Sequence, residues 1–243
     1  PINHLEGHAL SPSIENKISF PYLLLLVSGG HSQYLIVKGV NNYKQIGTTI
    51  DDAVGEAFDK TAKILNLGYP GGPNVEKFSK LGIKDSFILP QPIINRAGCN
   101  LSLAGLKTDV LRKSKNLKSN KERYNLAASF QETVNKILKK KTEVAMKQFR
   151  NEITGKSLKY FVVAGGVASN ETIRKGLKEV SLKMNFKPIF PSKEFCGDNA
   201  AMIAWAGIQR FKKKLFNKKN ETVKSRWPLD VKAPFLKGPG LKF

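Results

Sequence analysis

Two apolar stretches, each followed by a pair of glycines, constrain the fold of this 243-residue chain more than any other feature. Residues 22–28 and 158–164 are predicted to be buried strands, because apolar side chains run through them almost continuously. They end at Gly29-Gly30 and Gly165-Gly166. Without a Cβ atom, the backbone N–H groups of such a turn can approach a phosphate. We therefore expect two half-domains that each present a strand and its glycine pair to a shared nucleotide cleft.

The segments around these strands alternate strands with helices, a pattern typical of an α/β fold. A meander is predicted from strands at 22–28, 33–37 and 43–48, a short strand at 187–190, and strand-like pieces within 87–107. Helices are predicted from apolar spacing at 4–15, 49–67, 74–81, 121–153, 170–184 and 198–211. Thr49 to Asp52 resemble a capping box for one of these helices, and Asp198 is predicted to cap the last.

His4 and His8 stand four residues apart, a spacing that puts both imidazoles on one face of a helix. Neutral imidazole is a common ligand for iron and zinc, but a helical pair supplies only part of a metal site. Asp198 is the best third ligand by residue type, since two histidines and one carboxylate leave positions open for substrate. Spacing alone also allows a surface histidine pair and an Asp198 that serves only as a helix cap.

Zinc proteases also place two histidines at this interval, with the general base directly after the first histidine. Here Glu6 stands two residues after His4, about 200° around the helix. Its carboxylate is therefore expected to point away from a metal held by the pair. Without a general base near the metal, a zinc protease is disfavoured.

A third glycine-rich turn, Pro70-Gly71-Gly72-Pro73, is predicted to be a rigid loop. Three such turns favour a nucleotide cleft, whereas one alone is explained equally well as a tight turn. Asp59 and Glu76 flank this loop, and carboxylates suit ribose hydroxyls, although both also fit a solvated helix face. Asn170 follows the second glycine pair and is a candidate base or ribose contact, a helix cap, or both.

The chain carries 41 lysines and arginines against 19 acidic residues, a formal charge of +22. Such an excess favours a polyanionic partner, with tRNA, other RNA, DNA or an acidic membrane open, although a lysine-rich proteome also explains it. Lys139, Lys140 and Lys141 belong to the basic face predicted for the longest helix. Cys99 and Cys196 form no disulfide framework, which favours a reduced, cytoplasmic protein, and the longest apolar run is too short to cross a membrane.

Seven short segments occur in a specific order. They are His-Leu-Glu-Gly-His (4–8), Leu-Val-Ser-Gly-Gly-His (26–31), Ile-Asp-Asp-Ala-Val-Gly-Glu-Ala-Phe-Asp-Lys (50–60), Tyr-Pro-Gly-Gly-Pro (69–73), Gly-Leu-Lys-Thr (105–108), Ala-Gly-Gly-Val-Ala-Ser-Asn (164–170) and Phe-Cys-Gly-Asp-Asn-Ala-Ala-Met-Ile-Ala (195–204). From Asn3 to about Pro228, this set closely resembles the TsaD family, once called Gcp or O-sialoglycoprotein endopeptidase.

The resemblance implies the actin/hexokinase/Hsp70-like fold, in which two related α/β domains surround a nucleotide cleft. It also implies an acyltransferase that moves the threonylcarbamoyl group of threonylcarbamoyl-AMP to tRNA. The acceptor is N6 of the adenosine just 3′ of the anticodon, in tRNAs that read codons beginning with A, and the products are t6A and AMP. In bacteria such an enzyme works with TsaB and TsaE, and no membrane partner is expected.

Carried over residue by residue, the resemblance implies that His4, His8 and Asp198 hold one divalent metal, Fe²⁺ in preference to Zn²⁺. Residues near the glycine-rich turns are implied to hold the adenylate: Leu26, Val27, Ser28, Gly29, Gly30, Asp59, Gly72, Glu76 and Asn170. No residue stands out as a general base, so the rate is expected to come from positioning and electrostatics.

The family usually begins with an Asp-Thr-Ser-type phosphate loop and most of the first domain's sheet. That segment is absent here, so we expect an incomplete first domain. Three units are predicted. Residues 1–110 hold the rest of the first domain and the start of the second, and residues 111–228 hold further second-domain elements and the helix of the metal aspartate. Residues 229–243 form a basic mobile tail. Leu103 and Ala104 replace an aromatic residue and a serine. An ATPase or phosphotransferase of the same fold, or a silent tRNA- or partner-binding fragment, are the alternatives.

Overall fold

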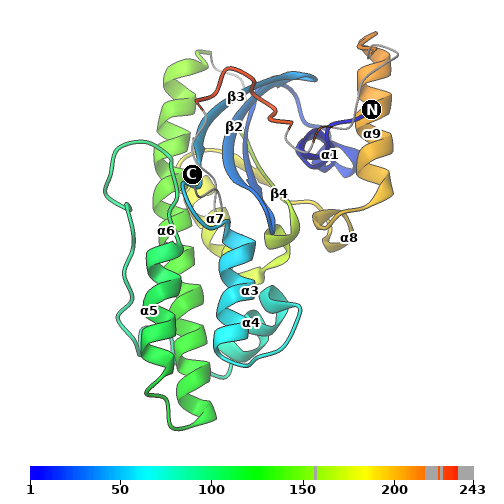
Figure 1. Ribbon diagram of the computed structural model, residues 1–243. Coiled ribbons are helices and arrows are strands. Elements are labelled where there is room, and N and C mark those ends of the chain that lie inside the picture. The colour runs from blue at the N-terminus through cyan, green and yellow to red at the C-terminus, as the bar shows by residue number, and fades with distance from the viewer. Residues whose placement is uncertain (156–157, 217–223, 225–226, 235–243) are drawn as a thin grey trace.

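One five-stranded sheet of order β3-β2-β1-β4-β5 forms the centre of the computed structural model, which describes residues 1–155, 158–216, 224 and 227–234 (Figure 1). The strands are β1 (Tyr22–Val27), β2 (Ser32–Gly39), β3 (Asn42–Thr48), β4 (Tyr160–Ala164) and β5 (Lys187–Ile189). The first three pair antiparallel, whereas β4 and β5 run parallel to β1. The predicted meander and α/β class are confirmed.

β1 and β4 are neighbours in this sheet, paired in parallel from Leu23↔Phe161 to Leu26↔Ala164. Both glycine pairs therefore leave the same end of one sheet, and the prediction that they belong to two half-domains is wrong. Gly165 has a φ of +96°, and a Cβ there would lie 2.3 Å from the carbonyl oxygen of Val27. Only glycine lets the two strand ends approach so closely.

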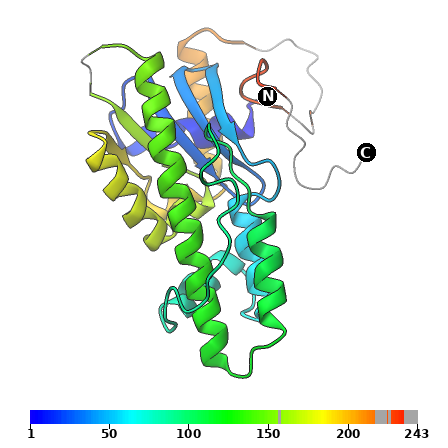
Figure 2. The ribbon, with the colours of Figure 1, turned by 90° about the vertical axis from the view of Figure 1, so that its left-hand side faces the viewer.

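Helices cover both faces of the sheet, because side chains of the buried β1 alternate between two apolar clusters. Leu23, Leu25 and Val27 pack with the helices on one face, and Leu24 and Leu26 pack on the face of the first helix. The helices of the larger face are α3 (Val54–Ile64), α4 (Gly71–Ser79), α5 (Ala104–Ser114), α6 (Asn120–Glu152) and α7 (Glu171–Lys183). Figure 2 shows α6 running along the sheet and beyond it, with α5 beside its far half.

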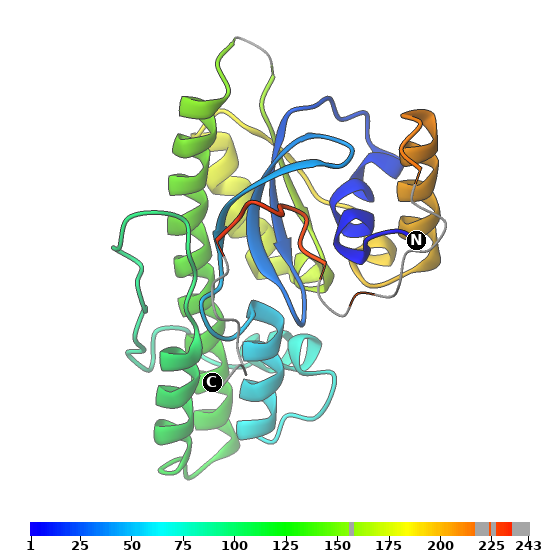
Figure 3. The ribbon, with the colours of Figure 1, turned by 45° about the horizontal axis from the view of Figure 1, so that its top comes forward.

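The opposite side of the molecule carries α1 (His4–Leu10), α2 (Pro12–Glu15) and α9 (Ala200–Lys212). α1 packs against α9, and both lie beside the sheet in Figure 3. In the sequence, α8 (Lys193–Cys196) lies between β5 and α9. It packs against the 3₁₀ turn η1 (Gly166–Ser169). This contact links the aspartate segment near residue 198 to the glycine turn after β4.

Segment 227–234 also reaches the sheet, and Figure 3 shows it crossing the strands. The backbone N–H of Gln45 donates to Asp230 at 2.9 Å, and Leu229 packs against the smaller apolar cluster. Of the tail predicted to be mobile, 235–243 lies outside the described residues. The units 1–110 and 111–228 both contribute strands to the sheet, and their division stays a prediction.

Several predicted element ends are wrong for local reasons. α3 begins at Val54, because Thr49 donates its hydroxyl to the carbonyl of Asp52 and Glu56 accepts the N–H of Ala53. α4 begins inside the predicted loop, at Gly71. The strand-like pieces within 87–107 reduce to one bridge, Thr49↔Leu101, among the described residues.

The lysine run of α6 does not form one basic face. Lys141 is fully buried and donates to the carbonyls of Arg96 and Gly98 at 2.8 and 3.1 Å. Lys139 pairs with Glu179 at 3.0 Å. Within the described part of the chain, no helix has both the length and the apolar character needed to span a bilayer.

Candidate functional site

His4, His8 and Asp198 meet in a cluster between α1 and the start of α9. Nε2 of His8 and Nε2 of His4 lie 2.9 and 3.4 Å from Oδ1 of Asp198. The three ligand atoms all lie within 4.8 Å of one another. His8 is buried, while His4 and Asp198 are exposed, so the cluster is open to solvent on one side. The predicted convergence of these side chains is present, and their binding of a metal stays a prediction.

Two local features allow this convergence. Asn199 caps α9 by accepting the N–H of Met202 at 2.8 Å, so Asp198 is not the cap that the sequence predicted. Its carboxylate is therefore available to the histidines. On α1, a Cβ at Gly7 would lie 3.1 Å from Ile203, which shows how closely the two helices pack.

The electrostatics of the cluster favour a neutral imidazole. Burial lowers the pKa of His8, and its hydrogen bond to Asp198 only partly offsets this. Neutral imidazole is the form that binds metals. Glu6 points elsewhere, as its position in the helix predicted: its carboxylate accepts hydrogen bonds from Tyr43 and Arg210. The fully buried Glu6 is therefore part of the packing of α1 and cannot serve as a base for this cluster.

A cavity of about 280 Å³ lies where the three glycine-rich turns meet. Five predicted nucleotide residues line it: Gly29, Asp59, Gly72, Glu76 and Asn170. Gly55, Phe58, Tyr69, Pro70, Pro73, Gly166, Val167 and Ser169 complete the lining. The cavity thus combines backbone from the ends of β1 and β4 with carboxylates from α3 and α4.

Other residues predicted to hold the nucleotide lie outside this lining. The side chains of Leu26 and Val27 are buried on opposite faces of the sheet, because successive strand residues alternate. Ser28 accepts the N–H of His31 at 3.1 Å, which fixes the turn. Gly30 is exposed and is not among the lining residues.

Two glycines let the lining close, and sequence reasoning missed one of them, Gly55. A Cβ at Gly55 would lie 2.7 Å from the carbonyl oxygen of Ser28, and one at Gly71 would lie 2.4 Å from Cα of Asp59. The N–H of Gly71 donates to Oδ1 of Asp59 at 3.0 Å, so this carboxylate holds the third turn in place. A glycine inside the predicted helix 49–67 was the available signal for Gly55.

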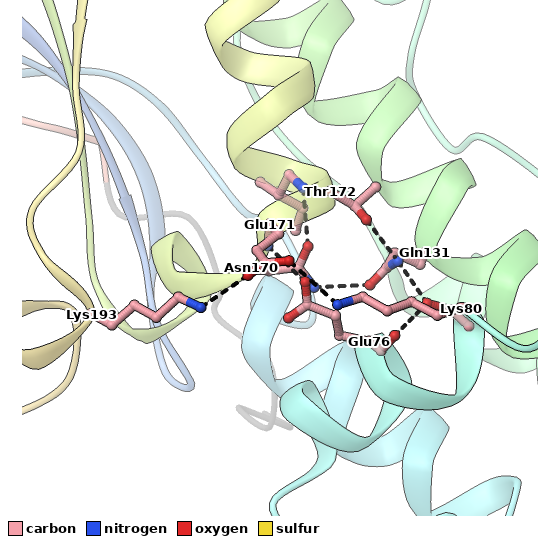
Figure 4. Close-up of polar contacts among 9 residues, drawn as sticks. Glu76, Lys80, Gln131, Asn170, Glu171, Thr172 and Lys193 are labelled. Carbon is pink, nitrogen blue, oxygen red and sulfur yellow. Dashed lines mark hydrogen bonds and ion pairs between the residues drawn. The ribbon is translucent and has the colours of Figure 1, made fainter.

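Hydrogen bonds and ion pairs of polar side chains join α4, α6 and α7 (Figure 4). Asn170 caps α7 by accepting the N–H of Ile173 at 3.0 Å, which confirms its predicted cap role. Its Nδ2 donates to Oε1 of Gln131 at 2.9 Å. Glu76 accepts the backbone N–H of Glu171 at 2.7 Å, and the Glu171 side chain pairs with two lysines. No feature of the sequence had singled out Gln131.

A family model described as "TsaD: tRNA N6-adenosine threonylcarbamoyltransferase" matches residues 1–205. The chain belongs to the TsaD family. The fold class that the resemblance implied is confirmed, since the mixed sheet is that of the actin/hexokinase/Hsp70-like class to which TsaD proteins belong. The described residues form one sheet, so the implied pair of related domains stays a prediction.

Curated TsaD relatives match almost the whole chain, and each bears the name tRNA N6-adenosine threonylcarbamoyltransferase. The Pelagibacter ubique protein is 54% identical over 241 residues, which cover 99% of this chain and 67% of that protein. A Rickettsia rickettsii protein is 47% identical, with 94% and 67% covered, and a Zymomonas mobilis protein is 47% identical, with 99% and 66% covered. The chain therefore spans about two thirds of the length of these relatives.

Among solved structures, T. kodakarensis HypF resembles this TsaD-family chain with a TM-score of 0.62. The similarity covers 87% of this chain and 37% of HypF, at 16% sequence identity. At that identity, the likeness concerns the fold alone.

Proposed function

We propose that this chain provides the metal and nucleotide sites of a tRNA N6-adenosine threonylcarbamoyltransferase. The observation that carries the proposal is the convergence of His4, His8 and Asp198. The same fold has a cavity between its three glycine-rich turns, and Asp59 and Asn170 line it. The substrate would be threonylcarbamoyl-AMP. N6 of the tRNA adenosine attacks the carbamoyl carbon, the bond from this carbon to the phosphate oxygen breaks, N6 loses a proton, and AMP leaves.

The residues present fit a divalent metal. Two imidazole nitrogens and one carboxylate oxygen lie close enough to share one ion, and burial lowers the pKa of His8, which favours its neutral form. We favour Fe²⁺ over Zn²⁺, because two histidines with one carboxylate are a common ferrous donor set. A bound ion would supply Lewis-acid polarisation and orientation of the carbamoyl group.

The cavity residues suit the adenylate. Gly29 and Gly72 lack a Cβ, so their backbone can approach the phosphate or ribose without steric conflict. Asp59 has a second carboxylate oxygen beyond the one bound to Gly71, and carboxylates accept hydrogen bonds from ribose hydroxyls. Glu76 would exchange its hydrogen bond from Glu171 for a ribose hydroxyl. Leu26, Val27, Ser28 and Gly30 would act by shaping the turn.

A tRNA substrate accounts for the formal charge of +22, since lysines and arginines neutralise phosphates. Because the relatives named above are bacterial, we extend the proposal to TsaB and TsaE as partner proteins and to a cytoplasmic location. The ATPase alternative gives no role to the cluster of His4, His8 and Asp198.

Nucleoside mass spectrometry tests this proposal. The protein, with TsaB and TsaE present, is incubated with threonylcarbamoyl-AMP and unmodified tRNA, and t6A is expected in the digested tRNA. We expect Asp198→Asn to reduce t6A formation at least tenfold, on the order of the loss seen when a metal ligand is weakened. The matched control is Asp85→Asn, which removes an exposed carboxylate paired with Lys136. No t6A from the wild-type protein, or equal t6A from both variants, would contradict the proposal.

A further inference from the structure

A chain of hydrogen bonds runs from α4 through α6 to α7 (Figure 4). The Ser79 hydroxyl donates to the carbonyl oxygen of Glu76 at 2.8 Å. Nε2 of Gln131 donates to Oγ of Ser79 at 2.8 Å, and Nδ2 of Asn170 donates to Oε1 of Gln131 at 2.9 Å. The chain ends where Oδ1 of Asn170 accepts the N–H of Ile173 at 3.0 Å.

The direction of this chain is set by the backbone groups at its two ends. The carbonyl of Glu76 can only accept, so the one hydroxyl proton of Ser79 goes to it, and Ser79 must accept from Gln131. Gln131 therefore turns its NH₂ group toward Ser79 and its oxygen toward Asn170. The N–H of Ile173 can only donate, which requires the same orientation of the Asn170 amide.

Gln131 has no hydrogen-bonding group left for any other role. Its second N–H donates to Oγ1 of Thr172 at 3.1 Å, so both donors and the oxygen are engaged. Gln131 is 5% exposed and does not line the cavity. Buried amides are costly to leave unpaired, and this orientation pairs both N–H groups and the oxygen of Gln131.

We propose that Gln131 is a positioning residue, which holds the Asn170 amide so that its second Nδ2–H serves as a hydrogen-bond donor to the nucleotide. Asn170 lines the cavity, and only one of its two amide protons is engaged by the described residues. The ligand atom that meets Asn170 must then be an acceptor, such as a ribose or phosphate oxygen or a ring nitrogen. This assignment rests on the proposed function, because it takes the cavity to hold an adenine nucleotide.

A double-mutant cycle with AMP as the probe tests the assignment, with the dissociation constant measured by calorimetry on the full chain. Loss of one neutral hydrogen bond by Asn170→Ala is expected to weaken AMP binding about tenfold. Gln131→Met keeps the length of the side chain but removes its donors and acceptor. It is expected to weaken binding between about twofold and tenfold in the wild-type background. In the Asn170→Ala background it is expected to cause no further loss, because Gln131 acts through Asn170.

Two further variants keep the test decisive. Gln148→Met is the matched control: Gln148 lies on the same helix, bonds to Glu152, and does not line the cavity, so AMP binding should not change. Ser79→Ala removes one link of the chain with a smaller change in packing. It replaces Gln131→Met in the cycle if that variant does not fold, and the same coupling with Asn170→Ala is expected.

The outcomes separate the assignment from the proposed function. Suppose that Asn170→Ala weakens AMP binding, but Gln131→Met has no effect or weakens binding equally in the wild-type and Asn170→Ala backgrounds. The assignment of Gln131 is then overturned, and the nucleotide cavity stands. If the wild-type protein does not bind AMP, or if neither Asn170→Ala nor Asp59→Asn changes binding, the nucleotide cavity is overturned and the assignment falls with it.

Discussion

Nε2 of His8 lies 2.9 Å from Oδ1 of Asp198, although 190 positions separate the two residues in the chain. The contact depends on the packing of α1 against α9 and on Asn199, which caps α9 in place of Asp198. We expect His8→Ala and Asp198→Asn each to lower bound Fe²⁺ or Zn²⁺ at least tenfold. Elemental analysis after dialysis against either ion measures this, and undiminished metal in both variants would refute the ligand assignment.

Two glycines near the cavity should respond differently to alanine. Gly165→Ala places a Cβ 2.3 Å from the carbonyl of Val27 at a φ of +96°, and should lower the free energy of unfolding by more than about 2 kcal/mol. At Gly72 no atom lies within 4 Å of an added Cβ, so Gly72→Ala should leave stability unchanged while weakening AMP binding. Urea unfolding and AMP calorimetry measure the two effects, and similar stability losses would contradict the close approach of the strand ends.

The pH dependence of stability should change when Asp52 is replaced. Asp52 pairs with Lys107 at 2.6 Å and Lys60 at 2.9 Å, which joins α3 to α5. Burial raises the pKa of Asp52, but the two ion pairs outweigh burial and hold the pKa below its ordinary value of 3.8. Because the folded pKa is the lower one, the stabilisation is present above the unfolded pKa and is lost as the pH falls through the folded pKa.

Asp52→Asn should therefore lower the free energy of unfolding by about 1–3 kcal/mol at pH 7, and by less below about pH 4. Urea unfolding at several pH values measures this difference between variant and wild type. A difference that does not shrink in acid would show that the ion pairs are not its source.

Asn170→Asp tests the direction of the hydrogen-bond chain through stability alone. Aspartate is as good a helix cap as asparagine, but its second oxygen would face Oε1 of Gln131, and two acceptors would repel. We expect a loss of about 1–3 kcal/mol in the free energy of unfolding. Ser79→Ala should recover part of it, because Gln131 could then turn its NH₂ group toward the aspartate. Equal stability of Asn170→Asp and wild type would contradict the fixed direction.

Those parts of the candidate site that form short local motifs could be predicted from the sequence. The spacing of His4 and His8, and the turns holding Gly29 and Gly72, could all be recognised before the structure. The parallel pairing of β1 with β4 could not be predicted, because the sequence of a strand does not specify which strand pairs with it. Gln131 could not either, because its role depends on partners 39 and 52 residues away that only the packed helices bring together.

A metal and an adenylate bound together by this one fold are central to the proposed function. Anomalous diffraction from crystals grown with Fe²⁺ or Zn²⁺ and AMP measures this directly. We predict an anomalous peak between His4, His8 and Asp198, with AMP in the cavity lined by Asp59 and Asn170. A peak on other residues, or AMP bound away from the glycine-rich turns, would contradict the account.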